Sequence, residues 1–472
     1  MIHKSLILVT AFFFLGSAVA FAEEPQTLTL NQALDMGFNQ NPAMRASQEG
    51  IKGSQYLKKA AWGLHLPNLS ATASYTFMSQ DIMNLDLNGP KNQLVGILSG
   101  LPLPLPPQLL EGLKQIDLSY TLQKRDFGIV GLNLIVPIYT GGKINAVNNA
   151  AKINVERAKS SAQKTEADLF TEITERYWGL AMAVQMERLA KEFVVAMENH
   201  SRDAAELEQN GIIAHTERLF VDMNLEQARA SLSSAQGQRQ TLQIALCGSM
   251  STPNVNYLPI TPLFVNQNVA SVEQFKKLTL ENSNALEQVE LMVRLAKEVV
   301  RGERAAFFPE IAAMGGANLW NYNLTNQIPT WTVGAGIKLS IFDGLTREYK
   351  YSAARSAVRQ TEALQEKAKI DIQILVEKIY SELTAAFDRV KAMESSILFA
   401  EEYLALREKA FSEGLSTASD VVDAELNLSK AKTERMAAAY KFDVALCTLL
   451  SLGNDSESFA NYQIGDSYKP IK

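Results

Sequence analysis

The chain carries the same passage twice, about 203 residues apart. In each copy a short alternating stretch runs into a long stretch without proline, and Val136 to Gly142 begins the first copy as Leu339 to Gly344 begins the second. Adding 203 to the number of Gly211 gives Gly414, and no gap is needed along the way. A duplication of this size constrains the fold strongly, because both copies must supply the same elements to one body.

The long stretches are predicted to form two helical hairpins. No proline lies between residues 143 and 210, and a straight helix of that length would measure about 100 Å. In each copy a glycine, Gly211 or Gly414, then reverses the direction of the chain, because glycine accepts the left-handed backbone that ends a helix. In the second copy apolar residues recur at alternating intervals of three and four, a coiled-coil rhythm. They are Leu383, Ala386, Val390, Met393, Ile397, Ala400 and Leu404.

Four segments of about ten residues alternate between apolar and polar side chains, near residues 68–78, 127–138, 310–320 and 331–342. This length suits a tilted strand that crosses a bilayer, although two hairpins of a soluble antiparallel sheet would share the period. Lipid does not tolerate open sheet edges. We therefore expect several chains to share one barrel, and the sequence alone does not choose between two chains and three.

The first 22 residues have the organisation of a secretory signal. Lys4 precedes an apolar run from Leu6 to Val19, and Ala20-Phe21-Ala22 forms a cleavage site. The alternative is an uncleaved membrane anchor, but the run is short for a spanning helix. No later segment offers 18 uncharged apolar residues. We expect an exported protein without spanning helices.

Little in the composition indicates chemistry. The net charge is −6 and no basic stripe is visible, which argues against nucleic acid as a partner. His65, His200 and His215 lack metal-ligand spacing, and no nucleophile or phosphate-binding motif appears. Cys247 and Cys447 read as small buried residues near helix ends, with a disulfide as the alternative in an oxidising compartment. We therefore expect no enzyme, no cofactor and no metal site.

The order of these segments resembles the outer membrane efflux proteins, the TolC-like family. Three stretches carry the resemblance: Leu28 to Leu34 followed by Asn41-Pro42, Pro137 to Gly142, and Gly414 to Leu426. It spans nearly the whole chain after the signal. The resemblance implies an α+β membrane protein, a homotrimer whose 12-stranded outer-membrane β-barrel takes four strands per chain and continues as a long α-helical coiled-coil tunnel in the periplasm.

This organisation predicts four regions along the chain. Residues 1–22 are the signal peptide. The first structural repeat, 23–250, ends in the helical hairpin 143–248, and the second, 251–454, ends in the hairpin 344–452. Residues 455–472 are a C-terminal tail.

The resemblance also implies a function without catalysis. Such proteins lie in outer membrane lipid as the exit duct of a tripartite efflux pump or a type I secretion system, and they dock on a periplasmic adaptor that links them to an inner membrane transporter. The rival hypothesis is a periplasmic coiled-coil adaptor or scaffold without pore activity. Adaptors, however, carry one hairpin flanked by compact β domains. The substrate, whether drug, metal or protein, is left open.

Two sets of residues correspond to working parts of the family. Asp420 and Asp423 match acidic residues that narrow the periplasmic entrance, and their spacing places both carboxylates on one helix face. In a trimer they would form two charged rings that favour cations; the alternative is that Asp420 only favours a helix N-terminus and that Asp423 is solvated. The positions that match adaptor-docking hairpin tips are Gly211, Ile212, Ile213, Gly414, Leu415 and Ser416.

The loop from Met78 to Asp126 is much longer than its counterpart in the second repeat. Its proline-rich run from Leu101 to Pro107 fits no regular helix or ladder. We expect the loop to project outside the cell or to fold over the barrel mouth. A surface decoration, a lid and a receptor-binding part are the alternatives.

Overall fold

The computed structural model describes residues 25–81, 83–100, 106–253, 255–325, 328–413, 415–464 and 467–471. The predicted signal segment and Gly414 lie outside the described residues. The chain divides into two compact units. The helical unit comprises Met1–Ser47, Ala162–Asn284 and Lys369–Lys472, and the sheet unit comprises Gln48–Ser161 and Ala285–Ala368.

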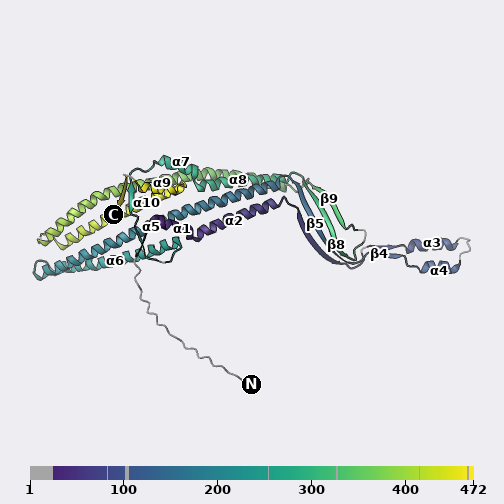
Figure 1. Cartoon of the computed structure of the whole chain (residues 1–472), viewed down its shortest axis with the longest axis horizontal. Helices are drawn as coiled ribbons and strands as arrows, with labels where there is room; N and C mark the ends of the chain where they lie inside the picture. Colours follow the sequence, from purple (N-terminus) through teal and green to yellow (C-terminus); the bar gives the residue numbers. More distant parts are fainter. Residues whose placement is uncertain are drawn as a thin grey trace, which may run out of the picture. The chain divides into compact units, whose positions relative to one another are not determined.

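Helices dominate the element order, and the two longest have equal length (Figure 1). The helices are α1 (Leu30–Gln40), α2 (Pro42–Gly63), α3 (Asn88–Gly100), α4 (Pro107–Gln115), α5 (Lys143–Gln209), α6 (His215–Met250), α7 (Val272–Asn282), α8 (Asn284–Ala305), α9 (Thr346–Ser412), α10 (Ala418–Leu452) and the 3₁₀ helix η1 (Ser456–Gln463). The strands are β1 (Gln26–Leu28), β2 (Asn68–Phe77), β3 (Met83–Asp86), β4 (Ser119–Gln123), β5 (Asp126–Thr140), β6 (Tyr257–Pro259), β7 (Leu263–Asn266), β8 (Glu310–Tyr322), β9 (Trp331–Lys338) and β10 (Tyr468–Ile471).

The predicted heptad stripe of α9 is a packing seam. Its residues from Leu383 to Ala400 are all buried, and Leu404 at its end is half-buried. Part of the stripe packs against α10, where Ile397 and Ala400 share a cluster with Leu428 and Ala431. The heptad prediction is confirmed here, because side chains three and four residues apart lie on the same face of a helix.

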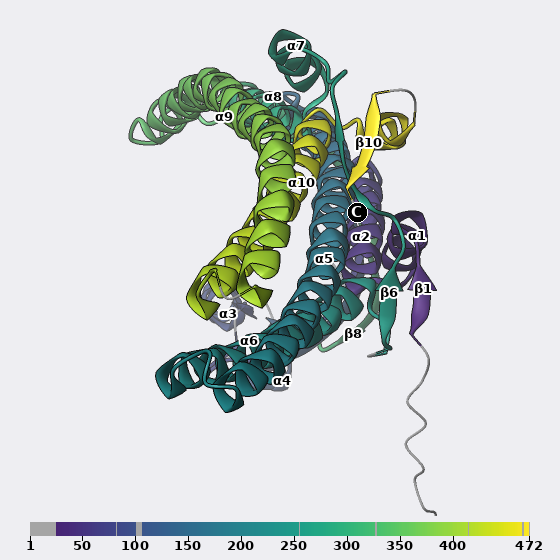
Figure 2. The same ribbon diagram turned by 90° about the vertical axis from the view of Figure 1, so that its left-hand side faces the viewer.

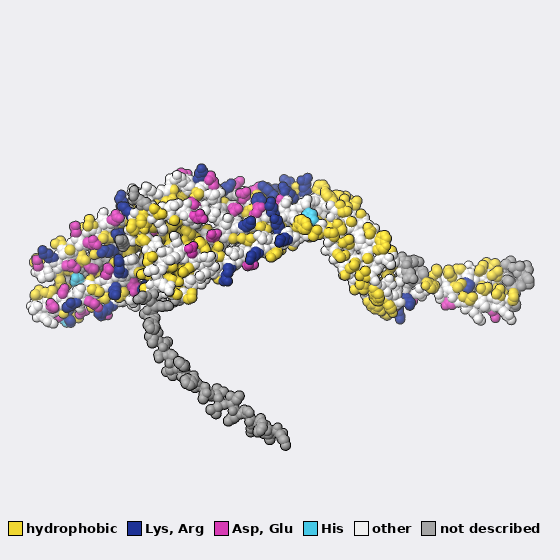
Figure 3. Space-filling model, in the orientation of Figure 1, with side chains coloured by type: hydrophobic (Ala, Val, Ile, Leu, Met, Phe, Trp, Pro, Cys, Tyr) yellow, Lys and Arg dark blue, Asp and Glu magenta, His cyan; other side chains and the backbone are white. Residues whose placement is uncertain are grey.

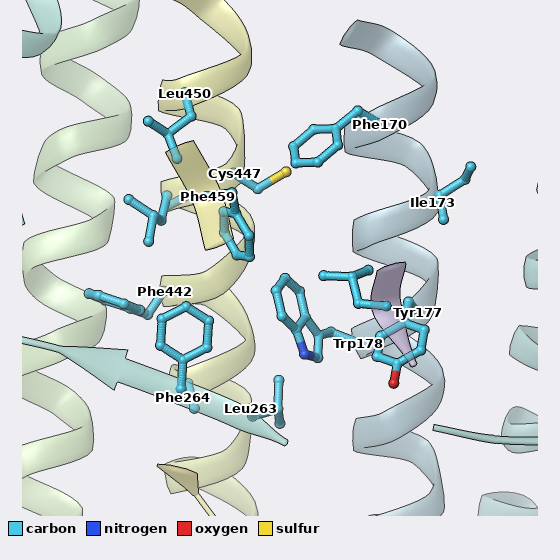
Figure 4. Packing of buried hydrophobic residues seen from close by; sticks show 14 of the residues in the cluster. Phe170, Ile173, Tyr177, Trp178, Leu263, Phe264, Phe442, Cys447, Leu450 and Phe459 are labelled. Atoms are coloured by element: carbon cyan, nitrogen blue, oxygen red, sulfur yellow. The ribbon is translucent and has the colours of Figure 1, made fainter. Parts of the chain in front are cut away.

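An aromatic core fills the centre of the helical unit (Figure 4). Trp178 of α5 packs against Phe264 of β7 and Phe459 of η1. The Tyr177 hydroxyl donates to the Leu28 carbonyl at 2.7 Å and accepts from the Thr261 N–H at 2.9 Å. One buried side chain thereby fixes two segments that cross the long helices.

The C-terminal segment after α10 packs onto the core of the helical unit. Phe459 of η1 lies in the core, and β10 pairs with β7 in an antiparallel ladder. The physical reason is that β7 would otherwise leave backbone groups unpaired in a buried place. A second small ladder joins β1 to β6 in parallel.

The sheet unit contains a four-stranded antiparallel sheet with the strand order β2-β5-β8-β9. Its register separates two kinds of cross-strand row. Leu69, Leu134, Gly315 and Val333 form an apolar row, and the next row, one residue along β2, is Ser70, Asn133, Gly316 and Thr332. Consecutive residues of a strand point to opposite faces, so the sheet has an apolar face and a polar face.

The apolar face of this sheet is exposed in the single chain. Leu69, Tyr75 and Val333 are examples, and hydrophobic side chains gather over the strands in Figure 3. β2 and β9 stand at the two open edges of the sheet. The alternating pattern suggested that β9 would reach residue 342, but it ends at Lys338, because its partner β8 begins opposite that residue, at Glu310.

The long loop after β2 is folded in its described residues, and residues 101–105 of the predicted proline-rich run lie outside them. It forms the antiparallel ladder of β3 and β4, with α3 and α4 at the end of that ladder away from the four-stranded sheet (Figure 1). None of the described helices combines the length and the apolar character needed to span a membrane. Cys247 and Cys447 are both buried and both free, and burial raises the pKa of the Cys447 thiol to about 12.

Candidate functional site at the hairpin tips

The turn between α5 and α6 is built around Gly211. Its backbone is left-handed, with φ of +69°, which an L residue adopts only with strain. The Gly211 N–H donates to the Glu208 carbonyl and the Ile212 N–H to the Leu207 carbonyl, both at 2.9 Å. This pair of bonds is the Schellman arrangement that satisfies the last carbonyls of a helix.

The turn between α9 and α10 repeats the defining bond of the first. The Leu415 N–H donates to the Ala410 carbonyl at 2.8 Å, and these residues correspond to Ile212 and Leu207 in the duplicated register. Ile212 is 57% exposed and Leu415 is 78% exposed. Each hairpin therefore presents one uncovered apolar side chain directly after its turn.

A small hydrophobic cluster lies beneath both turns. Its buried members come from all four long helices: Ala204 from α5, Val221 from α6, Phe411 from α9, and Ala418 and Val421 from α10. Ile213 is partly buried against this cluster. Figure 2 shows the two hairpins side by side, as this packing requires. Among the residues matched to docking, Ile213 thus has a structural task.

Asp420 closes a capping box at the start of α10. Its Oδ2 accepts hydrogen bonds from the Thr417 N–H at 2.9 Å, the Thr417 hydroxyl at 2.8 Å and the Ser416 hydroxyl at 3.0 Å. The Thr417 hydroxyl in turn accepts from the Asp420 N–H at 3.3 Å. The backbone N–H of Thr417, the two hydroxyls and the nearby Arg407 charge hold the pKa of Asp420 below its usual range. Ser416 is therefore engaged in the cap as well.

Asp423 lies on α10 one turn after Asp420 and is exposed. Val421, Val422 and Ala424 around it are buried. Asp423 consequently lies on the exposed side of α10, and Asp420, which is partly buried, lies one turn before it. The structure brings the two predicted constriction residues together on one face.

Sequence reasoning missed a charged network at the first turn. Glu208 lies between His215 Nδ1 and Arg218 Nε, each 2.7 Å from one of its carboxylate oxygens. Arg218 also faces Asp222 at 3.7 Å, and Asp222 accepts from the Ser201 hydroxyl at 2.6 Å. The available signal was a cluster of opposite charges on both sides of Gly211.

Two partly buried ionisable groups farther from the tips were also missed. Burial lowers the pKa of His200 on α5, against the attraction of Glu408. Burial raises the pKa of Glu425 on α10, and the charges of Glu408 and Glu192 add to the effect. Within the part of the chain that the structure describes, no group of three or more His, Cys, Asp or Glu side chains is placed to hold a metal ion.

The sequence profile of the outer membrane efflux protein family matches residues 33–251 and 277–454. The chain therefore belongs to this family, and the resemblance seen in its motifs is confirmed. It is an outer membrane channel protein of the efflux type, with its helical part in the periplasm. Family members are transport proteins.

The relatives and solved structures agree with this assignment. Protein CyaE of Bordetella pertussis is 21% identical over 274 residues, covering 55% of this chain and 56% of CyaE. The cobalt-zinc-cadmium resistance protein CzcC of Cupriavidus metallidurans is 25% identical over 312 residues, covering 63% of this chain and 70% of CzcC. The outer membrane protein VceC of Vibrio cholerae superposes with a TM-score of 0.71 at 16% identity, covering 90% of this chain and 96% of VceC.

The fold class follows from these matches. It is the α+β fold of the trimeric outer membrane channels, in which each chain gives four strands to a 12-stranded barrel and two hairpins to a helical tunnel. β2 and β9 are the two open edges of the sheet in this chain, and lipid does not tolerate open edges.

Proposed function

We propose that this chain is the exit duct of a tripartite efflux pump or a type I secretion system. In this function three copies pass substrate from an inner membrane transporter and its periplasmic adaptor to the exterior. The single observation that carries the proposal is the four-stranded sheet with open edges, one apolar face and one polar face. Such a sheet is stable in lipid only when copies close it into a barrel around a wet interior.

The rival hypothesis of a periplasmic adaptor without a pore gains no support from this sheet. In a water-soluble periplasmic adaptor, strands whose apolar face is uncovered along their length would be unfavourable. The polar row suits the inside of a channel, where the Asn133 amide donates to the Thr72 hydroxyl of the neighbouring strand at 3.2 Å. Both faces therefore favour a membrane channel.

Within this duct we assign the constriction to Asp420 and Asp423. Their support is that they lie one turn apart on α10, near the hairpin tip, with Asp423 exposed and Asp420 partly exposed. Three copies would set six carboxylates around the entrance, which favours cations. The capping task of Asp420 is compatible with this assignment, because a carboxylate keeps its charge while it accepts hydrogen bonds.

We assign adaptor contact to the exposed tip residues Ile212 and Leu415. Gly211 and Ser416 shape the turn and the cap, Ile213 packs inward, and Gly414 lies outside the described residues. Exposed apolar side chains at the tip of each hairpin suit a partner with a complementary apolar pocket. Substrate choice is then left to the transporter, and the metals in the name of CzcC are one candidate cargo.

The decisive experiment is reconstitution of the purified trimer into planar bilayers. The proposal expects discrete conductance steps and cation selectivity, measured as a reversal potential across a salt gradient. Asp423→Asn should shift the reversal potential toward zero, and Asp420→Asn/Asp423→Asn should shift it further. Glu166→Gln, an exposed acid on α5 far along the chain from the tip, is the matched control.

Two results would count against the proposal at different levels. A trimer that gives no conductance steps contradicts the duct. If conductance steps appear but their ion selectivity is unchanged in Asp420→Asn/Asp423→Asn, the duct is supported and the constriction assignment is contradicted.

A further inference from the structure

The insertion after β2 contains a helical hairpin with its own internal bonds. Lys91 of α3 donates to the Lys114 carbonyl at 3.2 Å, to the Asn88 side-chain oxygen at 3.1 Å and to the Ile116 carbonyl. Asn88 donates to Asp117 at 2.8 Å. Val95 is only 2% exposed between the helices. These contacts fix α3 against α4 and the start of β4.

Both helices nevertheless leave large apolar side chains uncovered. Leu94 and Ile97 of α3 are 58% and 63% exposed, and Leu109 of α4 is 54% exposed. Ile116 and Tyr120, which follow α4, are uncovered too. Apolar surface gathered on one small element marks an interaction site more often than scattered single residues do.

The charge of the insertion suits contact with another copy of itself. Between Met83 and Gln123 the charged residues are Asp86, Lys91, Glu111, Lys114 and Asp117. Two cations against three anions leave almost no net charge, so identical copies repel one another weakly. Lys91 is already bound within the hairpin.

Lipid is a less suitable occupant than a second copy. The ten-residue ladder of β2 with β5, from Asn68 to Phe77, has the length that spans a bilayer. The hairpin of α3 and α4 follows after a further ladder of β3 and β4, so it stands beyond the end of the spanning strands. Because β2 and β5 lie in the sheet that the three chains share, the barrel holds three hairpins close together at high effective concentration.

We propose that the α3/α4 hairpins of the three subunits pack on one another through Leu94, Ile97 and Leu109 and form a six-helix collar at the outer mouth of the barrel. In a three-fold ring each contact is heterologous, so one flank of a hairpin meets a different flank of the next. Exposed apolar residues on both α3 and α4 meet this requirement. The inference rests on the trimeric fold and goes beyond the transport activity.

Cysteine variants of the full-length protein test the collar. Leu94→Cys and Leu109→Cys replace the apolar contacts, and Asn92→Cys and Gln108→Cys are matched controls at exposed polar positions of the same helices. The native Cys247 and Cys447 are buried, so background labelling is low. Each variant is treated in detergent-solubilised trimers and in membranes, first with a membrane-impermeant maleimide and separately with a bis-maleimide cross-linker.

The collar predicts two results together in the solubilised trimer. Leu94→Cys and Leu109→Cys should react with the maleimide several-fold more slowly than the controls, and a Leu94→Cys/Leu109→Cys chain should yield several-fold more covalent trimer than Asn92→Cys/Gln108→Cys. Labelling at the rate of the controls, or no excess of covalent trimer, overturns the collar. Protection in membranes alone identifies lipid as the occupant and also overturns it. Light scattering on the same samples tests the trimer separately.

Discussion

At the residue scale, burial decides what an acidic side chain does. Asp423 is exposed on α10 and Asp420 is partly exposed, whereas Asp443 on the same helix is fully buried. Asp443 Oδ2 accepts from the Phe264 N–H at 3.1 Å, and its pKa is raised well above the usual range because burial disfavours the charged form. This buried acid thus ties β7 to α10.

This burial makes stability depend on pH. The folded-state pKa of Asp443 lies above the unfolded value, so its contribution to stability is full below the unfolded pKa and falls as pH rises toward the folded pKa. Asp443→Asn keeps the acceptor without the charge. We expect the melting temperature of the wild type, relative to that of Asp443→Asn, to fall as pH rises above about 4, the usual pKa of an aspartate, as measured by thermal unfolding in detergent.

Asp420 should not contribute to this pH dependence, because its pKa is shifted in the opposite direction. Its pKa is lowered, so its contribution is lost only as pH falls through the folded pKa, below the range tested. Equal pH dependence in the wild type and Asp443→Asn would show that Asp443 is ionised in the folded protein.

At the element scale, the hairpin turns depend on backbone conformation. Gly211 has a left-handed backbone with open space around its α-carbon, and Gly237 lies within α6 with equally open space. Substitution by alanine should therefore have a different effect at each glycine, because the two backbone conformations differ. A methyl group added at Gly211 would strain the left-handed backbone, whereas a methyl group added at Gly237 would increase helix propensity.

Gly211→Ala should destabilise the tip by about 1 kcal/mol, because an L residue in the left-handed region costs about that much. Gly237→Ala should stabilise by roughly 0.5–1 kcal/mol, as glycine is unfavourable inside a helix. Hydrogen exchange of the amides from Leu207 to His215 measures the first effect locally. Unchanged exchange in Gly211→Ala would mean that the turn tolerates another conformation.

At the scale of the whole molecule, one chain supplies only part of what its function requires. The sheet has two open edges, and the exposed apolar side chains of β2 and β9 have no cover within the single chain. A closed barrel removes both costs at once, since every edge is paired and the apolar face meets lipid. The open edges and the uncovered apolar face therefore both favour assembly with further copies of the chain.

The tips give a prediction for the assembled pump. Leu415→Asp and Ile212→Asp place a charge where we propose apolar contact with the adaptor, and each should reduce export in cells several-fold while the trimer still forms. Glu413→Ala changes a neighbouring exposed residue without removing apolar surface and should leave export intact. Export assays with trimer quantification provide the measurement, and full export by both aspartate variants contradicts the docking assignment.

Much of this architecture was readable in advance. Periodicity predicted the strands and the heptad seam, because alternation and three-four spacing are direct consequences of backbone geometry. Glycine at 211 predicted the turn for the same local reason. The pattern Thr417-x-x-Asp420 is that of a capping box, and the three sequence motifs indicated the family.

The tertiary structure alone decided the matters that depend on distant contacts. Burial of Asp443 follows from the packing of β7 on α10, and the last residues fold inward because β10 completes the ladder of β7. The described parts of the loop from Met78 to Asp126 fold through contacts such as the bond from Lys91 to the Lys114 carbonyl, 23 residues apart. Local pattern thus determined the elements, whereas burial and charge state depended on neighbours that no short stretch of sequence reveals.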